Sequence, residues 1–250
     1  MIEKYSQDLE VACYESDINS RMLPTAFLNL AQEAANQHAN YLGVGYDAMH
    51  ITRKAWVLSR LHVRFNHTPQ WRDKVNLQSW HKGANGYLYF RDFVVTDNAG
   101  RAAIEATTSW LVIDIDSRRL TKYTELAEDE ERCICEDVIA EQAPKITLPG
   151  GAEPQQVGSH TARYSDLDMN GHVNNVNYVE WALDSIGFDV TSKLPLKELF
   201  VNYNAEVKLG DEVVLKVWED TESGAAAEER IFYVIGEVGG KNSFIVKLVF

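Results

Sequence analysis

The chain has 250 residues and a formal net charge of −13, which argues against nonspecific binding to nucleic acid or to an anionic membrane surface. Its composition, 45% hydrophobic and 24% charged, is that of a globular protein with a substantial core. The length allows one large domain or two of about 100–120 residues. The first residues are polar and partly acidic, unlike a signal or transit peptide, and no run reaches the length of a transmembrane helix. We therefore expect a cytoplasmic protein that does not enter a membrane.

Three cysteines, Cys13, Cys133 and Cys135, are too few for a disulfide framework. Cys133 and Cys135 have a single residue between them, unlike the two-residue spacer of zinc-binding pairs, and no second pair follows. We therefore expect neither a metal nor any other cofactor.

The first half of the chain begins with a pattern that predicts a short strand ending in an Asp-x-Asn turn, at Asp17 and Asn19, and then a helix. Pro24 suits the first turn of that helix, because its missing N–H would have no partner there. Apolar residues then recur at helical spacing as far as Gly43, which is a typical helix stop.

Strands dominate the rest of the first half. Apolar residues of the first long strand alternate with mostly polar ones and predict one buried face: Val57, Leu61, Val63 and Phe65. Residues 87–97 and 102–116 flank a turn and predict a hairpin. The region 124–157 is rich in acidic residues and then in Pro and Gly, which predicts a solvated helix followed by a linker.

The second half of the chain repeats the first. Residues 167–185 match residues 16–34, and residues 196–218 match residues 58–80 without a gap. The matched pairs include Asp17/Asp168, Asn19/Asn170, Phe27/Tyr178, Ala31/Ala182, Leu61/Leu199, Val63/Val201, Phe65/Tyr203, Asp73/Asp211 and Trp80/Trp218. Duplication of a domain of about 100 residues explains this match better than chance does.

One long helix against a run of antiparallel strands, twice over, predicts an α+β fold with an internal duplication. We expect a first unit at residues 1–123, an acidic helix and linker at 124–157, and a second unit at 158–250.

A polar stretch stands out in the second half, where Asp168, Asn170 and His172 directly precede the predicted helix. Unpaired N–H groups and the helix dipole at such a position favour a developing negative charge. In an extended segment these alternate residues share one side and can supply a base or nucleophile, an amide and a proton-transfer group. Asn and Asp before a helix are commonly caps, and the first half keeps the Asp-x-Asn pair. It has Arg21 where the second half has His172, so the histidine is the better candidate for chemistry.

Residues 165–181, SDLDMNGHVNNVNYVEW, resemble the signature of acyl-[acyl-carrier-protein] thioesterases, the plant plastid and bacterial enzymes that hydrolyse fatty-acyl thioesters. Residues 116–122 and 202–211 are similar to other segments of that family, so the resemblance spans nearly the whole chain. It implies two tandem hotdog folds, each a long helix wrapped by an antiparallel sheet.

The resemblance also implies a catalytic set. Its members fall on Asp168, Asn170, His172 and Glu206. Glu206 stands opposite Thr68 in the repeat, so it too is confined to the second half. Plant members carry a Cys directly after this Glu, whereas this chain has Val207, so a Cys-His-Asn nucleophilic triad is not available here.

Simple alternation places Glu206 on the face of its strand opposite to Leu199, Val201 and Tyr203. If those residues pack on the helix, Glu206 needs a bulge or a strand-end position to reach the site. Asp168 and Glu206 both stay open as the general base on water or as a direct nucleophile.

We expect a metal-independent thioesterase that hydrolyses fatty acyl-acyl carrier protein (acyl-ACP) to free fatty acid and ACP. N–H groups near Val173 and Asn174 would hold the oxyanion. The first half would line the acyl tunnel, with Phe27, Leu30, Trp56 and Leu61 as candidates. A strongly acidic chain needs a local basic patch to bind an acidic carrier protein, and the candidates are Arg53, Lys54, Arg118, Arg119 and Lys122.

Three other functions stay open. An acyl-coenzyme A thioesterase would use the same pattern. A hotdog hydratase sets its His three residues after the Asn, whereas His172 is two residues after Asn170. A non-catalytic acyl-binding protein would bind ligand without turnover. The pattern does not indicate the length or saturation of the acyl chain, and monomer and homodimer are both compatible with it.

Overall fold

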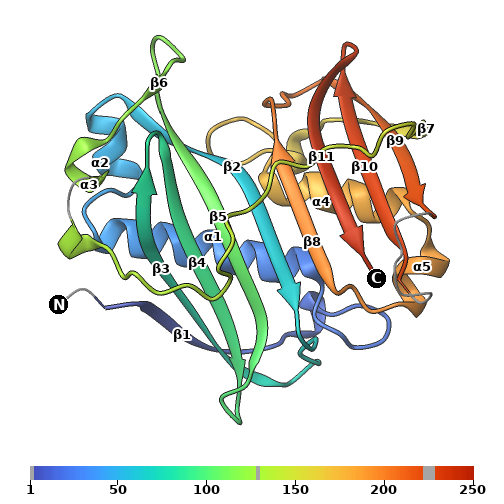
Figure 1. The fold of residues 1–250 in the computed structure, drawn as a ribbon, viewed down its shortest axis with the longest axis horizontal. Helices are drawn as coiled ribbons and strands as arrows, with labels where there is room; N and C mark the ends of the chain where they lie inside the picture. Colours follow the sequence, from blue (N-terminus) through green and yellow to red (C-terminus); the bar gives the residue numbers. More distant parts are fainter. Residues whose placement is uncertain (1–2, 128–129, 222–228) are drawn as a thin grey trace. The chain divides into compact units, whose positions relative to one another are not determined.

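The computed structural model describes residues 3–127, 130–221 and 229–250 (Figure 1). The chain forms two compact units, Met1–Ala143 and Pro144–Phe250, each with one long helix against an antiparallel sheet. The predicted α+β class and the two hotdog folds are therefore confirmed. Within the described ranges no helix is both long and apolar enough to cross a bilayer.

The first unit contains the strands β1 (Tyr5–Glu10), β2 (Lys54–Phe65), β3 (Lys74–Asn85), β4 (Leu88–Asp97), β5 (Ala102–Asp114) and β6 (Leu120–Thr121). Its helices are η1 (Cys13–Glu15), α1 (Pro24–Tyr41), α2 (Tyr46–Ile51), α3 (Thr124–Ala127) and η2 (Glu130–Arg132). The strands pair antiparallel in the order β1-β3-β4-β5-β2, and β6 adds to β5.

The second unit contains η3 (Tyr164–Asp166), α4 (Asn175–Ser185), α5 (Phe188–Lys193) and the strands β7 (Gln155–Thr161), β8 (Glu198–Tyr203), β9 (Glu212–Asp220), β10 (Ile231–Val238) and β11 (Lys241–Val249). Its order, β7-β9-β10-β11-β8, repeats the order of the first unit strand for strand. The duplication predicted from sequence is thus visible in the topology.

The long helices begin and end where their sequences predict. Pro24 is the first residue of α1, and Gly43, with φ +74°, follows its end in the left-handed conformation that glycine adopts without strain. Phe27 is fully buried and meets Phe65 of β2 edge-on, with 6.5 Å between ring centroids. Burial of such a side chain stabilises the fold by about 1.5–3 kcal/mol. Likewise α4 ends at Ser185, two residues before Gly187.

One local expectation is wrong in both units. The first strand does not end in the Asp-x-Asn turn, because the short 3-10 helices η1 and η3 come between strand and turn. Each is closed by an acidic side chain, Glu15 in η1 and Asp166 in η3, that accepts a hydrogen bond from the backbone N–H three residues earlier.

A bulge in β2 changes which residues face α1. The register with β5 shifts between Leu58 and Arg60, and one extra residue inverts the faces of the strand on either side of it. Trp56 therefore shares the inner face with Leu61, whereas simple alternation predicted Val57 there. The Trp56 indole N–H donates to the Val44 carbonyl at 2.8 Å, which fixes the ring on this face.

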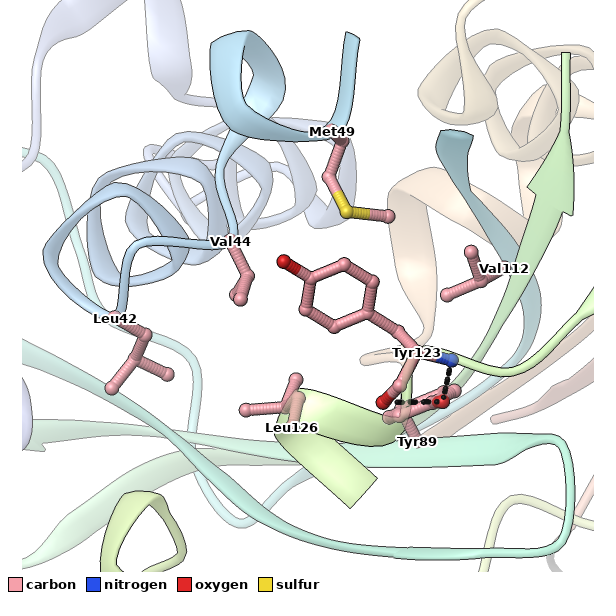
Figure 2. Close-up of a cluster of buried hydrophobic side chains, with 7 residues drawn as sticks. All are labelled: Leu42, Val44, Met49, Tyr89, Val112, Tyr123 and Leu126. Carbon is pink, nitrogen blue, oxygen red and sulfur yellow. Dashed lines mark hydrogen bonds between the residues drawn. The ribbon is translucent and has the colours of Figure 1, made fainter. Parts of the chain in front are cut away.

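Trp56 packs against a buried cluster of the first unit. Figure 2 shows the members of this cluster. The cluster consists of Leu42, Val44, Met49, Tyr89, Val112, Tyr123 and Leu126. The Tyr89 hydroxyl accepts from the Tyr123 N–H at 2.7 Å and donates to the Tyr123 carbonyl at 3.2 Å. These bonds satisfy a buried phenol and hold the chain after β6 against the sheet.

The segment between the two sheets is anchored, although the sequence suggested a solvated helix and a linker. Of its described residues before the second unit, only Thr124–Ala127 and Glu130–Arg132 are helical. Beyond them the chain runs extended over β3 and β4: the Ile134 N–H donates to the His81 carbonyl at 2.9 Å, and Ile139 is buried. Lys82 pairs with Asp137 at 2.7 Å, which attaches the acidic stretch to the sheet.

Candidate active site

The Asp-x-Asn loop of the second unit is organised around one carboxylate. Asp168 Oδ1 accepts from the N–H groups of Asn170 at 2.8 Å and His172 at 3.3 Å, and its Oδ2 accepts from Asn170 Nδ2 at 3.1 Å. Gly171 takes a positive φ of 75° between them. The carboxylate closes the turn as an Asx motif, so His172 leaves the loop with a defined direction.

His172 and Glu206 meet in this structure. The distance from His172 Nε2 to Glu206 Oε2 is 3.3 Å, and the two side chains are 27% and 30% exposed. Because β8 ends at Tyr203, Glu206 lies beyond the strand. The alternation of side chains between the two faces of β8 therefore does not decide where Glu206 points. The pairing of His172 with Lys208 as an isolated β-bridge draws the two segments together. The strand-end position that the sequence required for Glu206 is therefore the one observed.

The two N–H groups expected to hold an oxyanion have other partners. The Val173 N–H donates to the Val207 carbonyl at 3.0 Å, and the Asn174 N–H donates to the Asp166 carbonyl at 2.8 Å. The expectation is therefore wrong for both groups, because backbone pairing with Val207 and with Asp166 uses them. Among the described residues, the first N–H of α4 without an acceptor is that of Asn175. The sequence signal for this donor is the position of Asn175 directly after Asn174, a residue type that commonly caps helices.

A histidine that the sequence analysis missed lies next to this loop. His160 Nε2 is 3.0 Å from Asp166 Oδ2, and its ring lies 4.4 Å from that of Trp181 on α4. Asp166 also accepts from the Arg163 N–H at 2.6 Å, and its own carbonyl receives the Asn174 N–H. The pair thus supports the entry into the loop. No spacing rule connects His160 on β7 with Asp166, so only the fold reveals the contact.

The first unit builds the same loop with different side chains. Asp17 Oδ1 accepts from the N–H groups of Asn19 and Arg21, both at 2.8 Å, as Asp168 does in the second unit. Asp17 Oδ2 pairs with the Arg21 guanidinium, 2.7 Å from Nη2. An ion pair therefore occupies the place where the second unit has an imidazole and a glutamate.

The four candidate acyl-contact residues all lie in the first unit. Phe27 and Leu61 are buried at 0% and 4% exposure, whereas Leu30 and Trp56 are half-buried. Leu30 and Trp56 thus have more surface available to a ligand than Phe27 and Leu61.

The candidate basic residues gather at one end of the first unit. The Arg53 carbonyl accepts from the Ile115 N–H, and the Arg119 carbonyl accepts from the Asp114 N–H, so the two basic segments adjoin. Arg53 is exposed and pairs with Asp116. Arg118, Arg119 and Lys122 are exposed too, and we define these three residues as the basic edge. In the described part of the chain no group of three or more His, Cys, Asp and Glu side chains could hold a metal ion.

Two family models match the chain. One, described as the acyl-ACP thioesterase N-terminal domain, matches residues 2–129, and one described as the acyl-ACP thioesterase C-terminal domain matches residues 151–243. The resemblance identified from the sequence is therefore confirmed.

Curated relatives are similar over most of the chain. An oleoyl-acyl carrier protein thioesterase of Coriandrum sativum is 30% identical over 230 residues, which are 84% of this chain and 61% of the relative. A palmitoyl-acyl carrier protein thioesterase of Arabidopsis thaliana is 32% identical over 215 residues, 81% of this chain and 52% of the relative. The chain thus spans only about half to three fifths of the length of these two relatives.

Solved structures share the fold. An acyl-ACP thioesterase from Bacteroides thetaiotaomicron superposes with a TM-score of 0.83 at 26% identity, covering 98% of this chain and 96% of that one. The 12:0-ACP thioesterase from Umbellularia californica gives a TM-score of 0.83 at 21% identity, covering 98% and 93%. Both alignments extend over the two units.

Proposed function

This chain belongs to the acyl-ACP thioesterase family, and we propose that it hydrolyses the thioester of a fatty acyl group on acyl carrier protein to free fatty acid and ACP. The observation that carries the proposal is the contact of His172 with Glu206 at 3.3 Å, beside the start of α4. In the repeat these positions are Arg21 and Thr68, so the first unit has neither group.

The comparison of the two loops favours Glu206 as the general base. Within the described residues, the hydrogen bonds that the Asp168 carboxylate accepts come from its own loop. Asp17 accepts the matching backbone bonds in a unit without the histidine. Asp168 therefore has a structural role that explains its presence. Glu206 has no such counterpart, and its carboxylate faces an imidazole with which it can share a proton.

In the proposed reaction Glu206 takes a proton from water while the water oxygen bonds to the thioester carbonyl carbon. The carbonyl oxygen becomes negative and is held by the Asn175 N–H at the positive end of α4. The carbon–sulfur bond then breaks, and the leaving thiolate receives its proton through His172. Asn170 lies beside Asp168 and would orient the water or the acyl group. No metal or other cofactor takes part in this scheme.

The remaining parts of the substrate have proposed partners in the first unit. Phe27, Leu30, Trp56 and Leu61 would contact the acyl chain. The basic edge would contact acidic groups of ACP, because opposite charges steer such encounters. We propose a cytoplasmic location. We also propose a monomer or homodimer, since each of the two units carries its own sheet and helix.

The test is thiol release from a panel of acyl-ACP and acyl-coenzyme A thioesters that differ in chain length and saturation. Wild type is compared with His172→Ala, Glu206→Gln and the matched control Arg21→Ala, which changes the equivalent loop position of the other unit. Loss of either proposed catalytic group should lower kcat by roughly 10³-fold, within the range for general acid–base groups, with a smaller change in KM. Arg21→Ala should stay within about threefold of wild type, because Arg21 pairs with Asp17 in the unit that has neither proposed catalytic group. Arg119→Glu should raise KM for the ACP substrates only.

Three outcomes would overturn parts of the proposal. If no thioester is hydrolysed while acyl ligands still bind, the chain is an acyl-binding protein. Preference for coenzyme A substrates would reassign the carrier. Single turnover in H₂¹⁸O that places the label in the Glu206 carboxyl would replace the general-base route by direct attack and an anhydride.

A further inference from the structure

Two tyrosines contact the segments that carry the proposed site. One is bonded to the backbone next to Glu206, and the other to the first residue of α4. The Tyr178 hydroxyl, on α4, accepts from the Val207 N–H at 3.1 Å, and Val207 directly follows Glu206. Tyr178 is 3% exposed, and burial raises its pKa to about 12. The phenol therefore stays protonated at neutral pH and acts as a fixed dipole.

The second tyrosine holds the start of α4. Tyr203, the last residue of β8, donates its hydroxyl proton to the Asn175 carbonyl at 3.1 Å. Asn175 is the first residue of the helix, and its N–H is the proposed oxyanion donor. The Tyr178 and Tyr203 rings meet edge-on, with centroids 5.6 Å apart and an interplanar angle of 83°. One pair of rings thus connects the Glu206 segment with the helix start.

The first unit has the same ring pair without the hydroxyls. Phe27 and Phe65 occupy the equivalent positions and also meet edge-on, at 6.5 Å and 78°. Pro69 stands where the second unit has Val207, so no N–H needs an acceptor there. The Pro69 carbonyl still accepts from the Met22 N–H at 2.8 Å, as the Val207 carbonyl accepts from Val173 at 3.0 Å. This part of the fold therefore requires the rings but not their hydroxyls.

We propose that the hydroxyls of Tyr178 and Tyr203 are positioning groups for thioester hydrolysis. Tyr178 fixes the backbone beside Glu206 through the Val207 N–H, and Tyr203 fixes the first turn of α4 through the Asn175 carbonyl. Each phenol holds a segment that carries a proposed catalytic group. This inference rests on the proposed function and adds two residues to it.

The first experiment compares Tyr178→Phe and Tyr203→Phe with wild type on its best thioester. Tyr233→Phe, in the apolar cluster on β10 of the same unit, is the matched control for losing a buried hydroxyl. Because small misplacements of reacting groups are costly, the two site variants should lower kcat by roughly tenfold to a hundredfold with KM within about twofold. Tyr233→Phe should keep the wild-type kcat. Wild-type kcat in both site variants would overturn the inference while leaving the proposed function intact, whereas a wild type without hydrolysis would sink both.

A double variant separates positioning from stability. Tyr178→Phe alone leaves a buried Val207 N–H unsatisfied and should lower the melting temperature. Tyr178→Phe combined with Val207→Pro reproduces the Phe27/Pro69 pair of the first unit, with neither donor nor acceptor. We expect the melting temperature to recover and kcat to stay low, because the Glu206 segment is still released from α4. Recovery of kcat together with the melting temperature would overturn the inference.

Amide hydrogen exchange supplies a readout that does not depend on turnover. In Tyr178→Phe the Val207 amide should exchange faster, while the Val173 amide, which is bonded to a backbone carbonyl, should change less. If the double variant fails to fold, this exchange pattern and the split between kcat and KM in the single variant still decide the matter. Unchanged exchange at Val207 would contradict the inference.

Discussion

The two Asp-x-Asn loops of this chain share a backbone and differ in chemistry. Each turn closes with a hydrogen bond from an N–H to the Asp carbonyl, from Ser20 to Asp17 and from Gly171 to Asp168. The residue after the turn forms an isolated β-bridge in both units, with Gln70 as the partner in the first unit and Lys208 in the second. The backbone hydrogen bonds of this loop are therefore nearly the same in the two units.

The difference between the loops lies in two side-chain positions. In the first unit Arg21 pairs with Asp17 at 2.7 Å, and Thr68 stands at the other position. In the second unit His172 turns instead to Glu206 at 3.3 Å. A loop that serves as a turn in one unit can therefore carry chemistry in the other after two substitutions. This comparison also distinguishes Asp168 from Glu206. Asp168 has a counterpart, Asp17, that accepts the same backbone bonds in the first unit, whereas Glu206 has none.

The largest effect is expected when the second loop receives the side chain of the first. In His172→Arg the guanidinium should pair with Asp168 as Arg21 does with Asp17, and it cannot exchange a proton near neutral pH. We expect kcat/KM to fall by roughly 10³-fold, as for loss of a general acid–base group, with the fold retained. The reciprocal variant Arg21→His is the control and should keep near-wild-type turnover. Equal losses in the two variants would show that the loops do not differ in function.

An intermediate effect concerns histidines buried in the first unit. Burial, and next the positive charge of Arg91, lower the pKa of His38 and of His81 to about 4, from an ordinary value of 6.5. Below pH 6.5 the unfolded chain therefore binds protons that the folded chain refuses, so the free energy of unfolding falls as the pH falls from 6.5 toward 4. Between pH 6.5 and 5 the loss should be about 2 kcal/mol for each histidine.

Urea denaturation of wild type and His38→Gln at pH 7 and pH 5 measures this effect. Glutamine can replace both hydrogen bonds of His38, to Arg91 at 2.9 Å and to the Glu3 carbonyl at 3.2 Å, without titrating. The variant should lose less stability on acidification than wild type. Parallel curves would mean that His38 takes up its proton in the folded state as readily as in the unfolded state.

The smallest effect tests whether the two turns are interchangeable. Ser20 takes φ +62° in the first loop and Gly171 takes φ +75° in the second, and a Cβ added at Gly171 would meet no atom within 4 Å. Gly171→Ser should therefore cost about 1 kcal/mol of unfolding free energy, the left-handed penalty alone, and leave kcat nearly unchanged. Thermal or chemical denaturation together with the thioester assay checks both values. A large loss of kcat would show that a ligand approaches this glycine more closely than the serine allows.

Much of the fold was predictable because its signals are local. Pro24 and Gly43 bound α1, alternation indicates the strands, and the repeated spacing exposes the duplication. The contrast between Arg21 and His172 identified the unit with the candidate site before any geometry was known. Such features depend on backbone preference and side-chain burial, which a residue and its near neighbours largely determine.

Other features required the tertiary structure because they depend on pairing between distant segments. The β2 bulge that turns Trp56 inward exists only in register with β5, and the extended path of residues 133–143 depends on the sheet beneath it. The Val173 N–H is taken by the carbonyl of Val207, far along the chain, and the Asn174 N–H by that of Asp166 in η3, which the sequence did not predict. Among the described residues this leaves the Asn175 N–H as the first donor of α4 without an acceptor. The sequence by itself determined which residues are polar and which unit holds them; only the three-dimensional pairing decided that Glu206 lies past the end of β8, within reach of His172.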